Sequence, residues 1–380
     1  MHKHKQSQCK RKVKHRKNVM GLIIFCITVC IVFMFAYYQN LRKEISVRQE
    51  WLETVLTREK KWILENQGPE GEIYMNGSKA GDVNPYFACM AALGLLAETK
   101  NCPITETEKK AVGRYLDWHT GILLETDGKM GIYRKKSGKL IYKEKADSED
   151  GYLGMYLFLM GKYLEKTEST DLPEYWKKGI SLALKKIQSL MQDGITQVSE
   201  ENTTVYLMDN LEVWKGLYEL EHAGLKDVQA IREMRNKLQA QIEKLFWDDA
   251  NQRWRIIENS DLYHQKEFYP DGVAQIYPLI YEFPVKEKKK QKILYEQFTE
   301  RFQWQKLTKK RNGFLWAMTG MAAAQMGDIN NLLEMIRNYE AEYCENRKYP
   351  LYTGEAGWIC MECEKLYSLY ERKIKTGFLV

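Results

Sequence analysis

An aspartate stands at the head of an apolar, aromatic-rich segment, "FYPDGVAQIYPLIY", residues 268–281. Pro270 suits the first turn of a helix, and the apolar residues from Val273 to Ile280 recur at helical spacing. The pattern predicts a buried helix that carries a carboxylate, Asp271, at its N-terminal end. An Asp at this place commonly caps the helix. At the mouth of a cavity, the same carboxylate can act as a general acid or base.

Other apolar segments begin with acids or amides in the same way. These residues are Glu70, Glu72, Asn84, Asp147, Asp150, Asp209, Asn210 and Glu355. Capping alone predicts one Ser, Thr, Asn or Asp at each helix start. It does not predict paired acids one turn apart, such as Asp147 and Asp150, so these positions indicate a site as well as a set of caps.

Aromatic residues accompany the acids within a few positions. They are Tyr74, Tyr86, Tyr152, Trp214, Tyr269, Trp316 and Trp358. Sugar rings stack their C–H faces on aromatic rings, and their hydroxyls bond to carboxylates, so this combination favours a carbohydrate site. The alternative is that the aromatics fill the core, which is our interpretation for Trp214 and Tyr277.

Other chemistries fit the sequence less well. Beyond the N-terminal region the histidines are His119, His222 and His264, and none lies in a nucleophile pattern. Cys360 and Cys363 form a C-x-x-C, but no second pair or His cluster completes the four ligands of a structural zinc site. The sequence has no Gly-rich phosphate loop and no basic aromatic stripe for nucleic acid. We therefore expect no metal, no cofactor and no nucleic-acid partner.

The elements that must position these side chains are helices of two kinds. Amphipathic, charged helices are predicted at about 43–66, 105–119, 173–191, 226–246, 286–302 and 328–344. Helices that are apolar on nearly all sides are predicted at about 84–97, 148–164, 205–222, 270–282, 313–326 and 354–371. Helices of the second kind must be enclosed, whereas those of the first kind cover a core on one side. Strict alternation of the two predicts an all-α fold, an (α/α)6 toroid with an inner ring of helices inside an outer ring.

The lengths of the connections distinguish the two ends of this toroid. Links from an inner helix to the next outer helix are short, such as "EHAGLKD" and "QMGD". Links from outer to inner helices are long, such as "GILLETDGKMGIYRKKSGKLIYKEKA" and "WDDANQRWRIIENSDLYHQKEFY". Long loops collected on one face are usually functional. The inner helices begin on that face, so the acids are expected around its rim.

The hairpin pattern over about residues 45–372 resembles the six-hairpin glycosidase superfamily, and within it glycoside hydrolase family 8. "YPDGVAQIYPL" resembles that family's Tyr/Asp helix start, which implies that Asp271 is the general base of an inverting reaction. "ADSEDGYLGMYL" resembles its Asp-x-Asp helix start, which implies that Asp147, with Asp150 close by, holds the sugar at the cleavage point.

The general acid is less well defined by this resemblance. "PEGEIYM" resembles the family's Glu-Gly-x-x-Tyr segment, which implies Glu70 as the acid, together with Tyr74. In the family this Glu begins the inner helix itself, whereas here more than ten residues separate it from "NPYFACM". Glu72 and Asp209 are therefore alternative candidates.

The N-terminal region predicts a membrane anchor. The first twenty residues hold eight Lys and Arg and no acid; without these eight, 50 Lys and Arg remain against 51 Asp and Glu, so the rest is near −1. The next segment, "GLIIFCITVCIVFMFAYY", is uncharged and about as long as the ~20 residues that span a bilayer. No small-x-small cleavage site follows it, and the positive-inside rule places the tail in the cytoplasm. We expect a cytoplasmic tail (1–19), a single-pass signal anchor (20–38) and an extracellular domain (39–380).

Two functions fit these predictions. The first is a membrane-anchored extracellular glycoside hydrolase that cleaves a cell-surface or extracellular polysaccharide with a pair of carboxyl groups, by inversion. The second is a non-catalytic glycan-binding or assembly protein on the same fold, a partner of a polysaccharide synthesis or export complex. Expected substrate-binding residues are Tyr74, Asn84, Tyr86, Tyr152, Asn210, Tyr269, Trp316, Glu355 and Trp358.

Overall fold

A computed structural model describes the backbone of residues 2–77, 81–136, 139–169, 172–264, 266–307, 311 and 313–376; the side chains of 1–19, 21, 22, 24 and 376 lie outside the description. The chain divides into two compact units. The smaller comprises Met1–Trp51 and Tyr370–Val380, and the larger comprises Leu52–Leu369.

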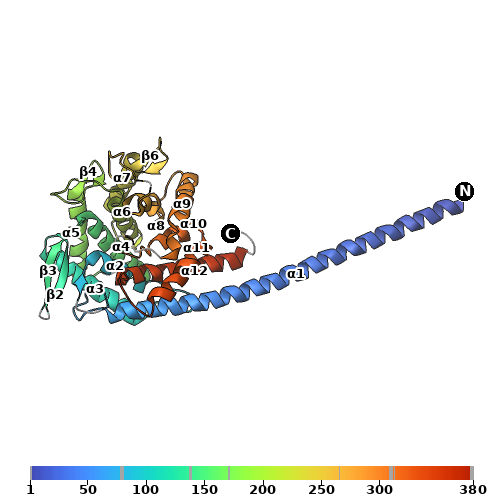
Figure 1. The fold of residues 1–380 in the computed structure, drawn as a ribbon, viewed down its shortest axis with the longest axis horizontal. Helices are drawn as coiled ribbons and strands as arrows, with labels where there is room; N and C mark the ends of the chain where they lie inside the picture. The colour runs from blue at the N-terminus through green and yellow to red at the C-terminus, as the bar shows by residue number, and fades with distance from the viewer. Residues whose placement is uncertain are drawn as a thin grey trace. The chain divides into compact units, whose positions relative to one another are not determined.

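The smaller unit contains most of the long helix α1 (His2–Glu65), which starts in the predicted tail and runs through the predicted anchor (Figure 1). Large apolar side chains such as Phe25, Phe33 and Phe35 are exposed along it. Within the described residues, Phe25–Glu65 is the one helix long and apolar enough to cross a membrane, and its most apolar window is not buried by the protein. A signal sequence would have the same properties, so the anchor, its orientation and the domain boundaries stay predictions.

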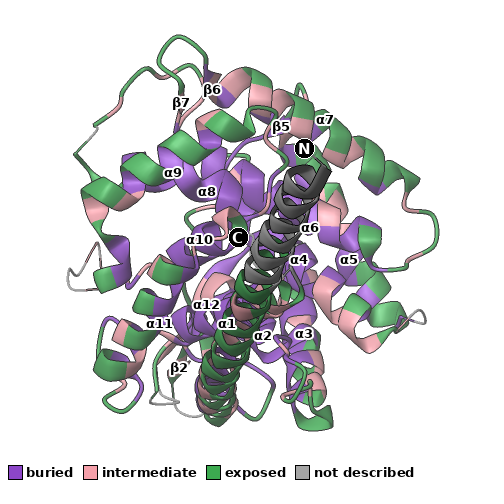
Figure 2. Cartoon of the chain, turned by 90° about the vertical axis from the view of Figure 1, so that its right-hand side faces the viewer, coloured by how far each residue is buried: buried purple, intermediate pink, exposed green. Residues whose placement is uncertain are grey.

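The larger unit is built from alternating outer and inner helices, as Figure 2 shows from one end. After the end of α1, the outer helices are α3 (Glu106–Glu125), α5 (Glu174–Leu190), α7 (Gln229–Phe246), α9 (Lys288–Phe302) and α11 (Ile329–Tyr343). The inner helices are α2 (Pro85–Leu95), α4 (Glu149–Thr167), α6 (Leu207–His222), α8 (Val273–Ile280), α10 (Thr319–Met326) and α12 (Thr353–Thr376). The inner helices are mostly buried, while the outer ones bury one face. The predicted (α/α)6 arrangement is confirmed.

Glycines let neighbouring inner helices approach closely, and they help to define the order of the ring. A Cβ added to Gly154 on α4 would lie 2.7 Å from the backbone nitrogen of Val213 on α6. A Cβ added to Gly357 on α12 would lie 2.1 Å from the backbone oxygen of Met90 on α2. Because α2, α4, α6, α8, α10 and α12 are neighbours in turn, α6 and α12 lie on opposite sides of the ring.

A buried carboxylate joins the first outer helix to the last. Glu59 near the end of α1 has no exposed surface. It accepts hydrogen bonds from the hydroxyl of Tyr339 (2.8 Å) and the thiol of Cys344 (3.2 Å), and it pairs with Arg347. A buried charge is stable only when it is paired and hydrogen-bonded, so Glu59 fixes the closure of the outer ring.

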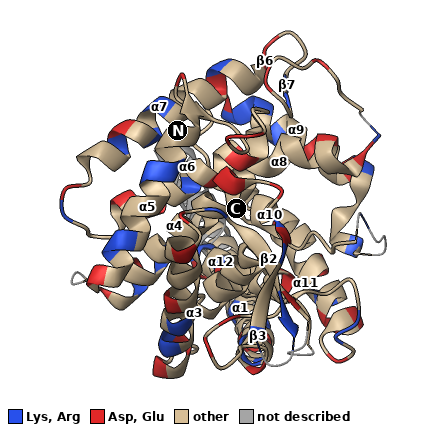
Figure 3. Ribbon diagram, turned by 90° about the vertical axis from the view of Figure 1, so that its left-hand side faces the viewer, with Lys and Arg blue, Asp and Glu red and all other residues tan. Residues whose placement is uncertain are grey.

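Short strands occupy the long outer-to-inner loops, where the sequence predicted no strands. β1 (Asp82–Val83), β2 (Gly131–Lys136) and β3 (Lys139–Lys145) form an antiparallel sheet with the order β1-β2-β3 (Figure 3). Two further pairs are β4 (Met191–Gln192) with β5 (Ile195–Thr196), and β6 (Trp247–Asp248) with β7 (Arg253–Trp254). Most of these strands have only two residues, too few to show alternation in the sequence.

Two inner helices begin later than predicted. The helix expected from 270 starts at Val273 after an irregular turn, Phe268–Gly272, in which Tyr269 is extended (φ −127°, ψ 136°). The helix expected from 313 starts at Thr319, because Trp316 has a left-handed backbone (φ 60°) that no continuous helix allows. Both exceptions carry residues of the site described next.

Candidate active site

A cavity of about 660 Å³ opens where the inner helices of the larger unit begin. The acidic residues that line it are Asp82, Glu144, Asp147, Asp209, Glu212 and Glu355. The aromatic residues that line it are Tyr86, Phe87, Tyr152, Tyr269, Tyr277, Phe314, Trp316 and Trp358. Most come from helix starts or from the loops before them, and the sheet β1-β2-β3 supplies another wall. One enclosed space therefore combines carboxyl groups with aromatic rings.

Glu212, in the first turns of α6, is held by three tyrosine hydroxyls. Its Oε1 accepts hydrogen bonds from Tyr277 (2.6 Å) and Tyr281 (3.3 Å), and also from Tyr86. Burial raises the pKa of Glu212 to about 7, although the hydroxyl donors oppose this rise by stabilising the anion. Asp209 and Asn210 were predicted from the sequence, whereas Glu212, one turn after Asp209 on the same helix, was not.

Asp209 lies one turn before Glu212 and is partly exposed to the cavity. Loss of solvent around its carboxyl raises its pKa well above the usual range, and the nearby charges of Asp150 and Glu212 raise it further. Asp209 is thus a carboxyl group that keeps its proton at a pH where an ordinary Asp has lost it. This is the property required of a general acid.

Glu355, at the start of α12, is fixed by backbone donors across the cavity. Its Oε1 accepts from the N–H groups of Leu315 (3.0 Å) and Trp316 (3.1 Å), and its Oε2 accepts from Ala317 (2.9 Å). Burial raises the pKa of Glu355 to about 7, while the three backbone donors lower it by favouring the charged form. The same contacts hold Trp316 in its left-handed conformation beside the cavity.

The aromatic side chains form paired surfaces. Tyr269 and Trp316 pack with ring centroids 4.8 Å apart, and Tyr86 and Tyr152 with centroids 5.5 Å apart. Trp358 is only 2% exposed, and its Nε1 has no hydrogen-bond partner among the described residues. A buried donor without a partner is costly. A hydroxyl of a bound ligand, or a water molecule, can supply the missing acceptor.

Ion pairs order the wall that the sheet provides. Asp82 on β1 pairs with Arg134 on β2 (2.5 Å) and with Lys143 on β3 (2.9 Å), and Lys143 also pairs with Glu144 (2.9 Å). The hydrogen bond from Arg134, followed by those from Lys143, lowers the pKa of Asp82. Asp82 is therefore an ionised structural partner of the sheet, whereas burial raises the pKa of Asp209 and of Glu355.

Most of the residues predicted from the sequence are brought together by this cavity. Of the predicted catalytic residues, Asp147 and Asp209 line it. Of the predicted substrate-binding residues, Asn84, Tyr86, Tyr152, Tyr269, Trp316, Glu355 and Trp358 line it. Asn84 also caps α2, because its Oδ1 accepts from the N–H of Tyr86 (2.9 Å). Capping and cavity lining are therefore compatible roles for one residue.

The remaining predicted residues do not line the cavity. Asp271 is buried, and its Oδ1 accepts from the backbone N–H of His264 (2.7 Å), so its carboxylate holds the preceding loop. Asp150 is buried and accepts from the hydroxyls of Ser148 (2.8 Å) and Thr196 (2.7 Å). Burial raises the pKa of Asp150 to about 6. The carboxylates of Asp271 and Asp150 thus bind neighbouring segments of the chain.

The predicted residues Glu70, Glu72 and Tyr74, in the loop before α2, also lie outside the cavity lining. Glu72 is buried and accepts from the hydroxyl of Tyr74 (2.8 Å) and the backbone N–H of Glu70 (3.0 Å), while Glu70 is exposed. Asn210 is buried against Thr196, with hydrogen bonds in both directions. The polar atoms of Glu72, Tyr74 and Asn210 are engaged in these internal contacts, away from the cavity lining.

Comparison with known proteins identifies the fold. No protein-family model matches the chain, and no characterised protein matches its sequence. A solved structure described as a wild-type glycosidase aligns over 87% of this chain and 98% of its own, at 12% identity and a TM-score of 0.57. A glycosidase variant in complex with glucose aligns over the same shares at 12% identity, with a TM-score of 0.56.

Enzymes of other activities share this fold. A D-mannose isomerase aligns over 84% of this chain and 97% of its own, at 11% identity and a TM-score of 0.56. An α-amylase from Clostridium perfringens aligns over 83% and 97%, at 12% identity and a TM-score of 0.53. The chain thus shares the (α/α)6 fold of these enzymes, as predicted. None of these matches is described as a family 8 enzyme, so that finer resemblance stays a prediction.

Proposed function

We propose that this chain is a membrane-anchored glycoside hydrolase that acts outside the cell on a polysaccharide. The observation that carries the proposal is that Asp209 and Glu355 line the same aromatic-rich cavity. Their helices, α6 and α12, lie on opposite sides of the inner ring. Hydrolysis of a glycosidic bond requires two carboxyl groups that flank the bond from opposite sides.

The two carboxyl groups differ in the way that the reaction requires. Asp209 is desolvated and surrounded by other acids, which keeps it protonated, and we assign it the role of general acid on the leaving oxygen. Burial raises the pKa of Glu355 to about 7, but three backbone N–H groups stabilise its charged form, and we assign it the role of general base on a water molecule above that pH. A base that activates water on the far side of the sugar produces inversion.

The lining side chains favour hydrolysis over sugar isomerisation. Isomerisation needs a base that removes a proton next to a carbonyl group, and His is the side chain most often used for proton transfer near neutral pH. No histidine is found among the described residues that line the cavity. Carboxyl groups and aromatic rings are abundant there. These are the groups that bind and protonate a sugar chain.

Helix α1 supports the membrane location in this proposal. Its apolar residues between Phe25 and Tyr37 are exposed, so a lipid bilayer that covers them would remove a large apolar surface from water. The basic residues before this stretch favour a cytoplasmic N-terminus and an extracellular ring. A cell-surface or extracellular polysaccharide is then the accessible substrate.

The direct test is hydrolysis of cell-surface polysaccharides by a soluble fragment that starts at residue 41, measured as new reducing ends. We expect release by the parental fragment, none by Asp209→Asn or Glu355→Gln, and an inverted anomeric configuration in the first product. Polysaccharide binding without any release of reducing ends would instead favour the non-catalytic glycan-binding or assembly role.

A further inference from the structure

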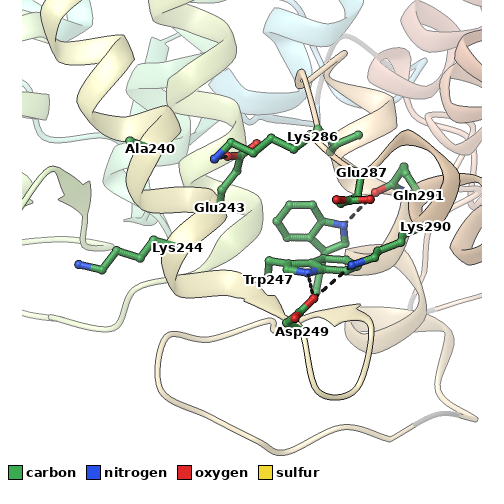
Figure 4. Close-up of a pocket in the computed structure, with 11 residues that line it drawn as sticks. Ala240, Glu243, Lys244, Trp247, Asp249, Lys286, Glu287, Lys290 and Gln291 are labelled. Carbon is green, nitrogen blue, oxygen red and sulfur yellow. Dashed lines mark hydrogen bonds and ion pairs between the residues drawn. The ribbon is translucent and has the colours of Figure 1, made fainter.

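A second cavity of about 290 Å³ lies on the outer ring, between the end of α7, the hairpin β6–β7 and the start of α9. Figure 4 shows the side chains that line it. It shares no lining residue with the central cavity. Its volume is near the lower end of the ~300–1,000 Å³ typical of small-ligand sites. Space of this size suits one or two rings of a small ligand.

Two tryptophans form the apolar part of this outer cavity. Trp247 and Trp254 are cross-strand partners in the hairpin, and their ring centroids lie 5.2 Å apart at an interplanar angle of 70°. The indole N–H of Trp254 donates to Gln291 (2.9 Å) and that of Trp247 to Asp249 (3.3 Å). Because both N–H groups have partners within the protein, the rings are fixed; the ammonium group of Lys290 lies 5.5 Å from the centroid of the Trp247 ring, which leaves the carbon surface beyond this contact for a ligand. Trp254 is buried, and Trp247 is the partly exposed one.

The charges around the tryptophans balance. The lining contains three basic and three acidic residues. The basic ones are Lys244, Lys286 and Lys290, and the acidic ones are Glu243, Asp249 and Glu287. Figure 4 shows Glu243 joined to Lys286, and Asp249 joined to Lys290 beside the ring of Trp247. Lys244 and Glu287 are exposed and have no ion-pair partner within the described chain. This charge balance gives no preference for a phosphate or a cation.

The outer cavity is also attached firmly to the segment that leads to the central site. The backbone N–H of Trp254 donates to the side chain of Gln275 (2.8 Å), whose amide donates back to the carbonyl of Trp254 (2.9 Å) and to that of Asp271 (3.1 Å). The buried side chain of Gln291 donates to the backbone carbonyl of Gln275 (2.7 Å). Both cavities lie in the larger compact unit.

We infer that the outer cavity is a second carbohydrate-binding site, which binds a neutral sugar unit of the polymer without cleaving it. A neutral sugar has an apolar C–H face for the ring of Trp247 and hydroxyls that both donate and accept, which suits a rim of free Lys244 and Glu287. The inference rests on the proposed function only for the identity of the polymer. Sugar binding here does not require that the central cavity be catalytic.

The test uses the full chain in a detergent without a sugar headgroup, with neutral hexasaccharides of glucose, xylose and mannose as probes and an oligogalacturonate as the charged comparison. We expect a neutral probe to bind to the outer cavity separately from any binding in the central cavity, and Trp247→Ala to weaken this outer binding about tenfold, which corresponds to ~1.4 kcal/mol. Trp247→Phe keeps an aromatic ring and should restore most of the affinity. Glu287→Gln, at an exposed position, should weaken binding several-fold without a change in the melting temperature.

The controls separate this site from the central one. Tyr175→Ala removes an exposed aromatic side chain of α5 that lines neither cavity, and should change nothing. If Trp247→Ala folds normally and binds every probe as the parent does, the second site is overturned, whether or not the parent hydrolyses the polymer. If the parent hydrolyses nothing but loses sugar binding on Trp247→Ala, the second site stands and the proposed hydrolase does not. Preference for the oligogalacturonate would also contradict the inference.

Discussion

Asp209 and Glu355 face one cavity, yet the protein holds the two carboxyl groups by different means. Asp209 has acidic neighbours and little solvent, which favours its neutral form. Burial raises the pKa of Glu355 to about 7, and its three backbone donors oppose this rise by favouring the charged form. Such a division between two titratable groups is how one site supplies an acid and a base at the same pH. The buried carboxylates outside the cavity, such as Asp271, have internal partners and no access to a ligand.

The first prediction compares two Asp→Asn changes. Asn keeps the shape of Asp209 but has no acidic proton to donate, and a positioned acid contributes ~10²–10⁴-fold in rate. We expect Asp209→Asn to lower the rate of polysaccharide hydrolysis by about that factor, with little change in the melting temperature. Asp271→Asn should retain hydrolysis, because the amide oxygen can still accept from the N–H of His264. If Asp271→Asn loses hydrolysis and Asp209→Asn retains it, Asp271 is the catalytic residue.

The second prediction concerns the pH dependence of hydrolysis. The base must be ionised, and the pKa of Glu355 is raised to about 7 by burial. We therefore expect kcat/KM to fall as the pH is lowered below about 7, when Glu355 takes up a proton. Glu212 titrates in the same range. A matched Glu212→Gln variant distinguishes the two, because it should keep the acidic limb of the profile; loss of that limb would assign it to Glu212.

At the scale of elements, the sequence pattern was sufficient to predict the helices. It was insufficient to predict which side chains contact one another within the site. The contrast between apolar and amphipathic helices persists over twelve segments, so the hairpin order could be predicted. The position of Glu212 in the cavity could not be predicted, because nothing in the sequence distinguishes a Glu on an apolar helix. Only the fold brings the hydroxyls of Tyr277 and Tyr281 within hydrogen-bond distance of it. Glu70 and Asp271 lie in segments that resemble family motifs, but the packing of the helices determines which carboxyl groups reach the cavity.

The third prediction tests the close approach of α4 and α6. A methyl group at Gly154 would collide with the backbone at Glu212 and Val213, at 2.7–2.9 Å, so α6 must shift. We expect Gly154→Ala to destabilise the protein by ~1–3 kcal/mol, as overpacking does, and to impair hydrolysis because Asp209 moves with α6. Thermal denaturation and the reducing-end assay measure both effects.

Gly113→Ala is the matched control for this change. Gly113 lies in the outer helix α3, where an added Cβ would approach only the flexible end of Tyr163 (3.2 Å). Ala is the better helix former, so Gly113→Ala should be neutral or stabilising. Equal destabilisation by both variants would contradict the special role of the α4–α6 contact.

For the whole molecule, the cluster of buried acids should set how stability varies with pH. The pKa is raised to about 6 for Asp150 and to about 7 for Glu212 and Glu355, above the usual values of ~3.9–4.3. In this range the native state binds more protons than the unfolded state, so the free energy of unfolding rises as the pH falls. Ion-paired Glu282, with its pKa lowered to about 2 by Lys215 and Lys365 against the effect of burial, loses its contribution only below about pH 4.5.

The fourth prediction is therefore a melting temperature that rises between pH 8 and pH 5.5, by about 1–2 °C for each kcal/mol that is gained in a fragment of this length. Differential scanning calorimetry of the fragment from residue 41 measures it. Glu212→Gln should flatten the slope, because it removes one of the groups that gain a proton. A melting temperature that falls steadily over this range would show that the cluster is ionised throughout.

The fifth prediction concerns the orientation of the chain in a membrane. Protease added to intact cells should remove the region beyond residue 40 and leave the basic tail, as the positive-inside rule requires. An epitope tag at each end reports the two fragments by immunoblotting. Recovery of an uncut chain from intact cells, with cleavage after lysis, would place the ring in the cytoplasm.

The closure of the outer ring at Glu59 has a consequence for biosynthesis. The contacts of Glu59 with Tyr339, Cys344 and Arg347 span 280, 285 and 288 residues, so they are among the last that a growing chain can form. Contacts of such sequence separation make folding slow. Until they form, the carboxylate of Glu59 has only its neighbour Arg58 as an ion-pair partner (3.7 Å) on the first outer helix. A chain that crosses a membrane in N-to-C order would thus be unable to complete its cavity before its last hairpin had emerged. Cleavage of a polysaccharide would have to wait for the same step.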